Sequence, residues 1–208
     1  MPNNKKNVSL GKPKVDGMVY VANTGTTLPT DATTPLTEQY KNVGFISDDG
    51  ITNSTDTDTT TVTDAGGNTV INEITSYSET YQFAMMETQA DALGVRFGSE
   101  NVKTEEEKLT VDHKMPSGES KIYVFEILLT GNKVKRIVVP DGTITEYGDT
   151  QYHAGDAILY DVTVGANPSS LINGATSREY IATITSPHGS AATLGKNAKP
   201  AKADAPTA

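Results

Sequence analysis

The chain has 208 residues with a net charge of −9, no Cys, no Trp and three His. The lack of Cys excludes disulfides, thiolate metal sites and a Cys nucleophile, and so few His leave little for a metal centre or a Ser–His mechanism. Segment 48–107 holds 13 acids against Arg96 and Lys103. Such a surface repels phosphates, which excludes a protein that reads DNA sequence, although a merely solvated acidic surface explains the charge equally well.

The two ends of the chain are basic and the middle is acidic. Residues 1–14 carry four Lys and no acid, and residues 190–208 carry three Lys against Asp204. No secretory signal or membrane span is expected, because the polar start is followed by no apolar core and no run approaches ~18 apolar residues. We therefore expect synthesis in the cytoplasm and no membrane partner.

Strands are expected to dominate, because Thr, Val and Ile are frequent. Met18–Ala22 and Val43–Ser47 predict short strands, the second ended by a turn at Asp48–Gly50. Segment 48–69 is rich in Thr and Asp, has too few apolar residues to pack, and predicts a long loop. Loops longer than ~12–15 residues in compact domains are usually functional, the alternative being a mobile surface loop.

Val70–Glu87 predicts a long extended run in which polar and apolar residues alternate from Tyr77 onward. Glu79 is the exception on the apolar side. Glu87–Phe97 predicts the one helix, ended by Gly98. The core-like face carries Tyr77, Tyr81, Phe83 and Met85, and the other face carries the small or uncharged residues Ser78, Thr80, Gln82 and Ala84.

The second half of the chain predicts a meander of strands joined by hairpins. Its turns are expected at Gly131–Asn132 and Pro140–Gly142. The expected strands are Lys121–Thr130, Lys133–Val139, Thr143–Tyr147, Ala157–Val164 and Glu179–Ser186.

No motif carries catalytic chemistry. Asp56–Thr61 begins like a calcium loop but lacks Gly at its sixth position and Glu at its twelfth. No phosphate-binding glycine loop or nucleophile elbow is present, and His188 has no evident partner. We therefore expect no catalytic, cofactor-binding or metal-binding residues and no enzyme.

Four stretches, taken in order across residues 15–186, resemble the major tail protein, or tail tube protein, of long-tailed non-contractile bacteriophages (siphoviruses). Their order and spacing carry the resemblance, since no single motif is specific. The stretches are Gly17–Ala22 leading into Gly25–Ala32, Val43–Thr52 with Gly66–Val70, Thr75–Phe83, and Val138–Glu146 with Gly155–Ile158.

The resemblance implies a mainly β fold, a β-sandwich or barrel-like tail tube domain with one short flanking helix. It also implies a virion structural protein of the phage tail, assembled as stacked hexameric rings whose lumen conducts viral DNA without binding it specifically. Implied partners are further copies of the chain, the tail tape measure protein, and the tail terminator and distal tail proteins. An open-ended ring-on-ring contact is the symmetry that makes filaments.

We therefore divide the chain into an N-terminal arm (1–17), a β-rich tail tube domain (18–186) and a C-terminal arm (187–208). Segment 48–69 is expected to make ring-stacking contacts, and one face of the strand at 77–85 to line the lumen. The expected ring-stacking residues are Asp48, Asp49, Asp56, Asp58, Asp64 and Asn68; the expected lumen residues are Ser78, Thr80 and Gln82.

Two alternatives remain open. The tube of a contractile tail or secretion-type injection machine shares the implied architecture. A surface carbohydrate-binding or adhesin-like β-module would have similar Thr-rich strands, but it normally stacks sugars on exposed aromatic residues, and the chain has no Trp.

Overall fold

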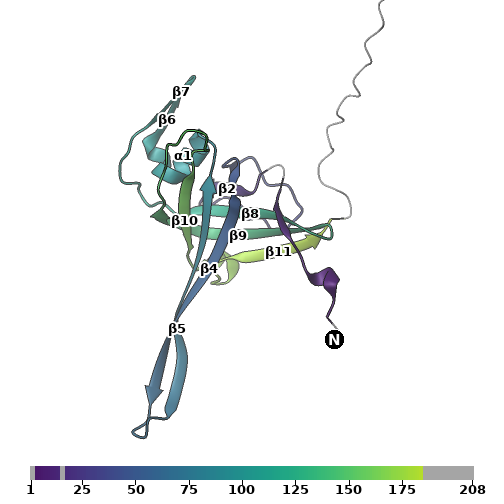
Figure 1. The fold of residues 1–208 in the computed structure, drawn as a ribbon, viewed down its shortest axis with the longest axis vertical. Coiled ribbons are helices and arrows are strands. Elements are labelled where there is room, and N and C mark those ends of the chain that lie inside the picture. Colours follow the sequence, from purple (N-terminus) through teal and green to yellow (C-terminus); the bar gives the residue numbers. More distant parts are fainter. Residues whose placement is uncertain (1–2, 15–16, 185–208) are drawn as a thin grey trace, which may run out of the picture.

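The computed structural model describes residues 3–14 and 17–184. Within these residues it is mainly antiparallel β-structure with one α-helix, as the sequence predicts. Figure 1 shows a body from which a long hairpin projects at the bottom and strand ends extend to the right. The elements in chain order are η1 (Lys5–Asn7), β1 (Gly11–Pro13), β2 (Val19–Asn23), β3 (Lys41–Asn42), β4 (Ile46–Thr63), β5 (Thr69–Met85), α1 (Ala90–Phe97), η2 (Ser99–Asn101), β6 (Val102–Glu105), β7 (Lys108–Val111), β8 (Lys121–Leu129), β9 (Lys133–Tyr147), β10 (Tyr160–Ala166), η3 (Ser170–Ile172) and β11 (Arg178–Thr183).

The main sheet has the order β3-β2-β8-β9-β10-β5-β4, with β1 added beside β8 and β11 beside β9. β9 is its central strand and has two halves, because residues 133–138 pair with β11 and residues 142–147 pair with β10. The turn predicted at Pro140–Gly142 is therefore wrong. One extra residue of β9 is accommodated there as a bulge opposite β8, so the strand bends and continues.

The sheet is rolled, so strands that are distant in its order face each other. β5 and β8 are separated by β9 and β10, yet the rings of Tyr81 and Phe125 stack with their centroids 4.8 Å apart. The connection from β3 to β4 then links the two ends of the sheet: Val43 N donates to Val19 O at 3.2 Å, and Met86 N donates to Phe45 O at 2.9 Å. The result is the barrel-like fold that the resemblance implies.

The core fills the inside of this roll. Buried apolar side chains of β2, β5, β8, β9 and β10 pack with those of α1 in one cluster. The helix expected at 87–97 spans Ala90–Phe97, buries Ala92, Leu93 and Val95, and ends at Gly98, whose φ of 88° favours glycine. A smaller cluster on the other face of β2 and β8 is covered by the loop that contains Leu28, Leu36 and Tyr40.

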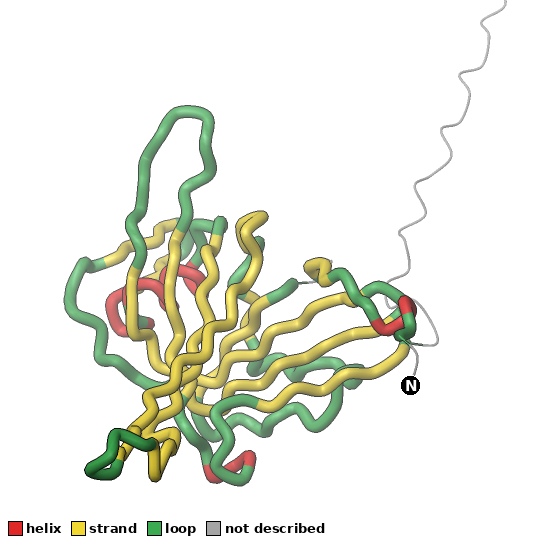
Figure 2. Tube along the Cα trace, turned by 60° about the horizontal axis from the view of Figure 1, so that its bottom comes forward, coloured by secondary structure: helices red, strands yellow, loops and turns green. Residues whose placement is uncertain are grey.

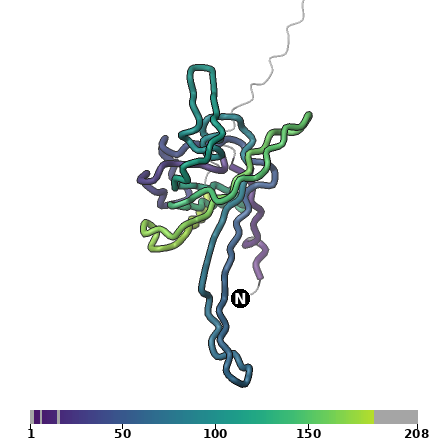
Figure 3. The backbone as a smooth tube through the Cα atoms, turned by 90° about the vertical axis from the view of Figure 1, so that its left-hand side faces the viewer, coloured from purple at the N-terminus to yellow at the C-terminus, as the bar shows by residue number. Residues whose placement is uncertain are grey.

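The long loop predicted at 48–69 is wrong as local structure. These residues form most of β4, the turn and the start of β5, and Figure 3 shows the resulting hairpin well clear of the body. The turn predicted at Asp48–Gly50 is a bulge within β4, with Gly50 at a φ of 73°, and residues 43–45 are not in a strand. Thr-rich sequence without apolar residues still forms strands here, because Thr has high β propensity and each strand satisfies the other's backbone.

The N-terminal arm is only partly described, and the C-terminal arm is not described. Residues 11–13 of the N-terminal arm form β1 and pair with residues 127–129 of β8. The C-terminal arm at 187–208 lies outside the described residues, as do the last residues of the strand predicted at Glu179–Ser186.

Candidate functional site

Four neighbouring strand segments present one continuous face, which we call the polar sheet face: β4, β5, β10 and residues 142–147 of β9. Residues directly opposite each other in an antiparallel pair share a face of the sheet. Thr80 lies opposite Ser54 on one side and Gly165 on the other, and Ser78 lies opposite Asp56. The next row contains Thr52, Gln82, Thr163 and Glu146. The structure thus brings Ser78, Thr80 and Gln82 together on one face, away from the core.

The polar sheet face carries no fixed positive charge. Its four segments contain no Lys or Arg and eight acids. Asp56, Asp58 and Glu146 are exposed, and Asp161 Oδ2 accepts a hydrogen bond from Gln82 Nε2 at 2.9 Å. Small hydroxyl side chains and acids therefore form a surface that repels polyanions and offers them no cation to bind.

Each side of this face ends in a strand edge that no strand of the described residues covers. β4 pairs only with β5. On the other side β8 begins at Lys121, opposite Gly142, so residues 143–147 of β9 extend past it. β4 carries neither Pro nor Lys, although its four Asp and its bulge between Ile46 and Ile51 are features that also limit pairing with another chain. Both edges therefore have backbone groups that no strand of the described residues pairs.

Glu79 is buried at the base of the hairpin, on the apolar side of β5. Its carboxylate accepts hydrogen bonds from Tyr81 Oη at 2.7 Å, Ser177 Oγ at 3.0 Å and Asn53 Nδ2 at 3.1 Å, and also from Thr176 Oγ1. Burial raises the pKa of Glu79, but these hydrogen bonds together outweigh it and leave the pKa below its ordinary value. The interruption of the apolar alternation marked this residue in the sequence; its partners from segment 176–177 were not predictable.

The six residues predicted to stack rings fall into three groups along the hairpin. Asp48 and Asp49 lie in the bulge near the body, and Asp56 and Asp58 lie midway along β4. Asp64 and Asn68 form the turn: Asp64 Oδ1 accepts from the backbone N of Gly66 and of Asn68, both at 2.8 Å. The structure therefore brings only the last two into contact.

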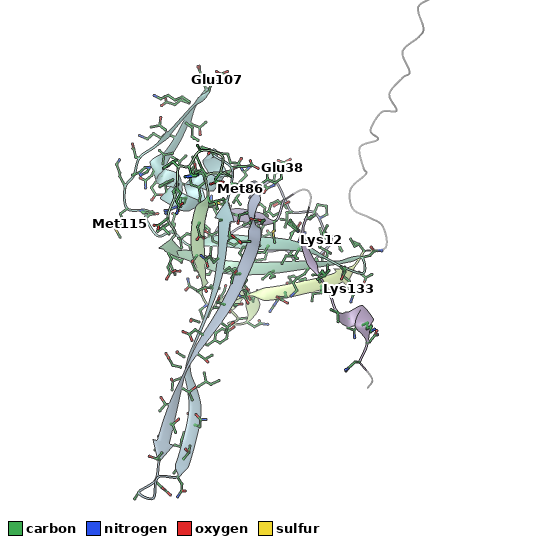
Figure 4. The ribbon with its side chains drawn as sticks, in the orientation of Figure 1. Lys12, Glu38, Met86, Glu107, Met115 and Lys133 are labelled. Atoms are coloured by element: carbon green, nitrogen blue, oxygen red, sulfur yellow. The ribbon has the colours of Figure 1, made fainter. Side chains whose placement is uncertain are left out.

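The hairpin also exposes apolar side chains that sequence reasoning did not assign to a site. Ile74 is 64% exposed, Ile71 49% and Val62 45%, and the last two are cross-strand partners. Tyr77, predicted on the core face, is 56% exposed, because its side of β5 extends beyond the body there. Figure 4 shows side chains projecting from the hairpin with no other element beside them. An isolated two-stranded hairpin is marginally stable, so exposed apolar residues on one indicate a contact with another chain.

A buried ion pair lies at the opposite end of the sheet. Arg136 and Glu126 are 2% and 1% exposed, and Arg136 Nε donates to Glu126 Oε1 at 2.8 Å. Arg136 also donates to Asp31 O at 2.8 Å, and Lys14 Nζ pairs with Glu126. This network connects the N-terminal arm and the loop around Asp31 to the sheet. Opposite charges ten residues apart, on either side of the Gly131–Asn132 turn, were the available signal.

Neither a metal-binding cluster nor a membrane-spanning helix occurs among the described residues. Among them no three His, Asp or Glu side chains gather as a metal-binding group. In the same part of the chain, no helix is long and apolar enough to cross a bilayer.

Comparison with known proteins gives three results. The chain is similar in fold to a protein in the tail of an empty GTA particle, refined with helical, C6 symmetry; the match has a TM-score of 0.38 and 13% identity and covers 72% of this chain and 90% of the other. No curated protein matches the chain. The family model for phage tail tube proteins matches residues 1–167, most of the chain. This protein therefore belongs to the phage tail tube protein family, and it is a structural component of the phage tail, not an enzyme.

Proposed function

We propose that the chain forms hexameric rings that stack into a tail tube, with the polar sheet face lining a lumen through which viral DNA passes into the host. The observation that carries this proposal is the combination of a cation-free polar face and two uncovered edges on the same set of strands. In a ring, the β4 edge of one subunit continues the sheet from residues 143–147 of the next, and closure of the sheet removes every edge.

The chemistry of the polar sheet face suits a conduit. DNA that slides past Thr80, Ser54 and Gly165 meets no Lys or Arg, so no counterions are released and no ring holds the phosphates. Glu146 and Asp161 add a repulsion that salt screens over ~8–10 Å. The DNA is therefore kept away from the wall without specific contacts.

The hairpin beyond Glu79 is proposed to contact the adjoining ring. Residues 55–63 of β4 extend roughly 30 Å at the usual rise of a strand, which is far enough to pass beyond the subunit's own body. Following the family resemblance, we also propose the tape measure protein as the occupant of the lumen before DNA, and the terminator and distal tail proteins at the tube ends.

A charge substitution tests the lumen assignment. Thr80→Lys places a cation on the polar sheet face, where the residues directly opposite it, Ser54 and Gly165, are uncharged. Virions should assemble but eject DNA at least about tenfold more slowly at low salt, with recovery at high salt. Gln82→Lys should be milder, because Asp161 already contacts residue 82 at 2.9 Å.

Thr80→Glu is the matched control, since it adds bulk at the same position with the opposite charge. It should eject at the normal rate. Equal ejection by the Lys and Glu variants from complete tails contradicts the assignment of this face to the lumen.

A further inference from the structure

The right-hand strand ends in Figure 2 form a sheet surface that lacks a covering layer among the described residues. Two rows of cross-strand neighbours define it, and we call it the platform: Ile127, Lys135 and Ile181 in one row, Leu129, Lys133 and Thr183 in the next. The preceding row begins with Phe125 and Ile137, which are buried in the core. The platform therefore lies on the same face of these strands as the core, beyond the point where the core ends.

The two faces of these strand ends differ. On the other face Val134 is 5% exposed, and it lies with Leu128 against Ala32 and Thr33 of the loop before β3. On the platform Ile181 is 57% exposed. Ile127 and Ile181 flank Lys135 on this face. Exposed apolar side chains on a sheet face that no element of the described residues covers indicate that a further element packs there.

The tip of the hairpin has matching chemistry on one of its faces. Val62 lies opposite Ile71, and the next rows on this face are Thr60 with Glu73 and Asp58 with Ser76. The two strands cross in Figure 1, so the ribbon twists between body and tip, and this tip face no longer has the direction of the polar sheet face. The opposite tip face, with Ile74 and Thr59, carries no charge at these rows.

The charges on the two surfaces are complementary. Residues 54–78 contain four acids and no Lys or Arg. The platform carries Lys133, labelled in Figure 4, and Lys135, which pairs with Glu179 at 2.8 Å. The chain's own residues 185–208 are less complementary to the platform than the hairpin tip is. They contain three Lys and one Asp, so their net charge is positive, like that of the platform.

We propose that the hairpin tip of one subunit packs its Val62–Ile71 face on the platform of a second copy of this chain, with Glu73 beside Lys133. The apolar side chains of the two surfaces meet as those of two stacked sheets do, about 10 Å apart. Glu73 and Asp58 then face the platform's Lys residues, and this charge match fixes which surface the hairpin chooses. The inference rests on the proposed stacking of subunits into a tube and names the surface that receives the hairpin.

Reciprocal charge reversal tests the pairing. Lys133→Glu and Glu73→Lys, each alone, should slow assembly of purified subunits into tubes about tenfold or more at low salt, because like charges meet at every contact. The two changes combined in one chain should restore the rate to within about twofold of the unsubstituted protein. Lys133 has no acid opposite it within its own sheet, so its reversal should leave the circular dichroism melting curve of the monomer unchanged.

The second measurement is acetylation of Lys133 by an amine-reactive reagent, read by mass spectrometry. Lys133 should react in monomers and be protected in tubes. Failure of the combined variant to recover, or equal reactivity of Lys133 in both states, overturns the inference. Protection already in the monomer that is lost on removal of residues 187–208 also overturns it, and assigns the platform to the chain's own C-terminal arm. Removal of the hairpin tests a different hypothesis, namely that the hairpin is needed for stacking. Its outcome does not depend on which surface receives the hairpin.

Discussion

The two halves of β9 lie in regions of the molecule with opposite charge. The first half pairs with β11 and carries Lys133, Lys135 and Arg136, whereas residues 142–147 pair with β10 and carry only Glu146 as a charged residue. The bulge at Pro140–Gly142 separates them. A single strand therefore connects a basic surface and the cation-free polar sheet face, and the bend lets the two point in different directions.

This division has a physical consequence for a subunit that assembles with itself. Acidic hairpins attract the basic end of other copies, while the polar sheet faces repel one another and any polyanion between them. The same net charge distributed evenly over the surface would provide neither effect.

Removal of the hairpin should abolish tubes. Replacement of residues 58–76 by Asn-Gly joins Thr57 to Tyr77, which are cross-strand partners, through a two-residue hairpin turn. The core lies elsewhere, so the subunit should fold with an unchanged melting curve by circular dichroism. Electron microscopy should then show no long tubes. Tubes of normal length from this variant contradict a role for the hairpin in stacking.

Arg136→Met should be the most destabilising single substitution at the basic end. It leaves the Glu126 carboxylate, 1% exposed, without its main partner, which typically costs about 3–5 kcal/mol of unfolding free energy. Lys135→Met is the matched control, since its pair with Glu179 is partly exposed and should be worth no more than about 1 kcal/mol. Urea unfolding measures both, and equal losses would contradict the assigned role of the buried pair.

Local alternation predicted part of this molecule well. The period of two from Tyr81 to Met85 identified the buried face of β5 and, with it, the side that carries Thr80 and Gln82. That signal is local, because a strand that is buried on one side carries an apolar residue at every second position. The alternation wrongly predicts that Tyr77 is buried, since the sequence does not show where β5 extends beyond the body.

Turn residues misled the prediction where they serve as bulges. Asp48–Gly50 and Pro140–Gly142 have the composition of turns, yet both lie inside long strands, where an extra residue on one strand bends it. The hairpin itself was missed because Thr-rich strands outside the core show no apolar alternation. Most residues of β4 pair with residues of β5 that are 12 or more positions away in the sequence. Amino-acid composition does not reveal such long-range partners.

Glu79→Gln should weaken the base of the hairpin in a pH-dependent way. The variant loses hydrogen bonds to a carboxylate, for which about 1–2 kcal/mol at pH 7 is expected. Because the pKa of Glu79 is lowered by these bonds, their stabilisation is present above the ordinary carboxyl pKa near 4.5 and is lost as the pH falls through the lowered value. Urea unfolding at pH 7 and near pH 3 should therefore show a difference between the two proteins that shrinks in acid.

Glu146→Gln is the control for that experiment, because Glu146 is exposed on the polar sheet face. Its stability should follow that of the unsubstituted protein at both pH values. A difference between Glu79→Gln and the unsubstituted protein that grows in acid would contradict the charge state assigned to Glu79.

Asp64→Ala should have the smallest effect, confined to the tip of the hairpin. The Asn68 side chain and the backbone N–H groups of Asn68, Gly66 and Gly67 lower the pKa of Asp64, so its carboxylate holds the turn above the ordinary pKa of 3.8 and releases it as the pH falls through the lowered value. The variant should exchange its Gly66 and Asn68 amides faster at pH 6 while the melting curve of the body stays unchanged. Glu73→Gln, in the strand away from the turn, should leave those two amides unaffected. Unchanged exchange in Asp64→Ala would mean that the two-stranded ladder alone sets the turn; faster exchange means that the tip is organised by its own side chains, independently of the core, before it meets another subunit.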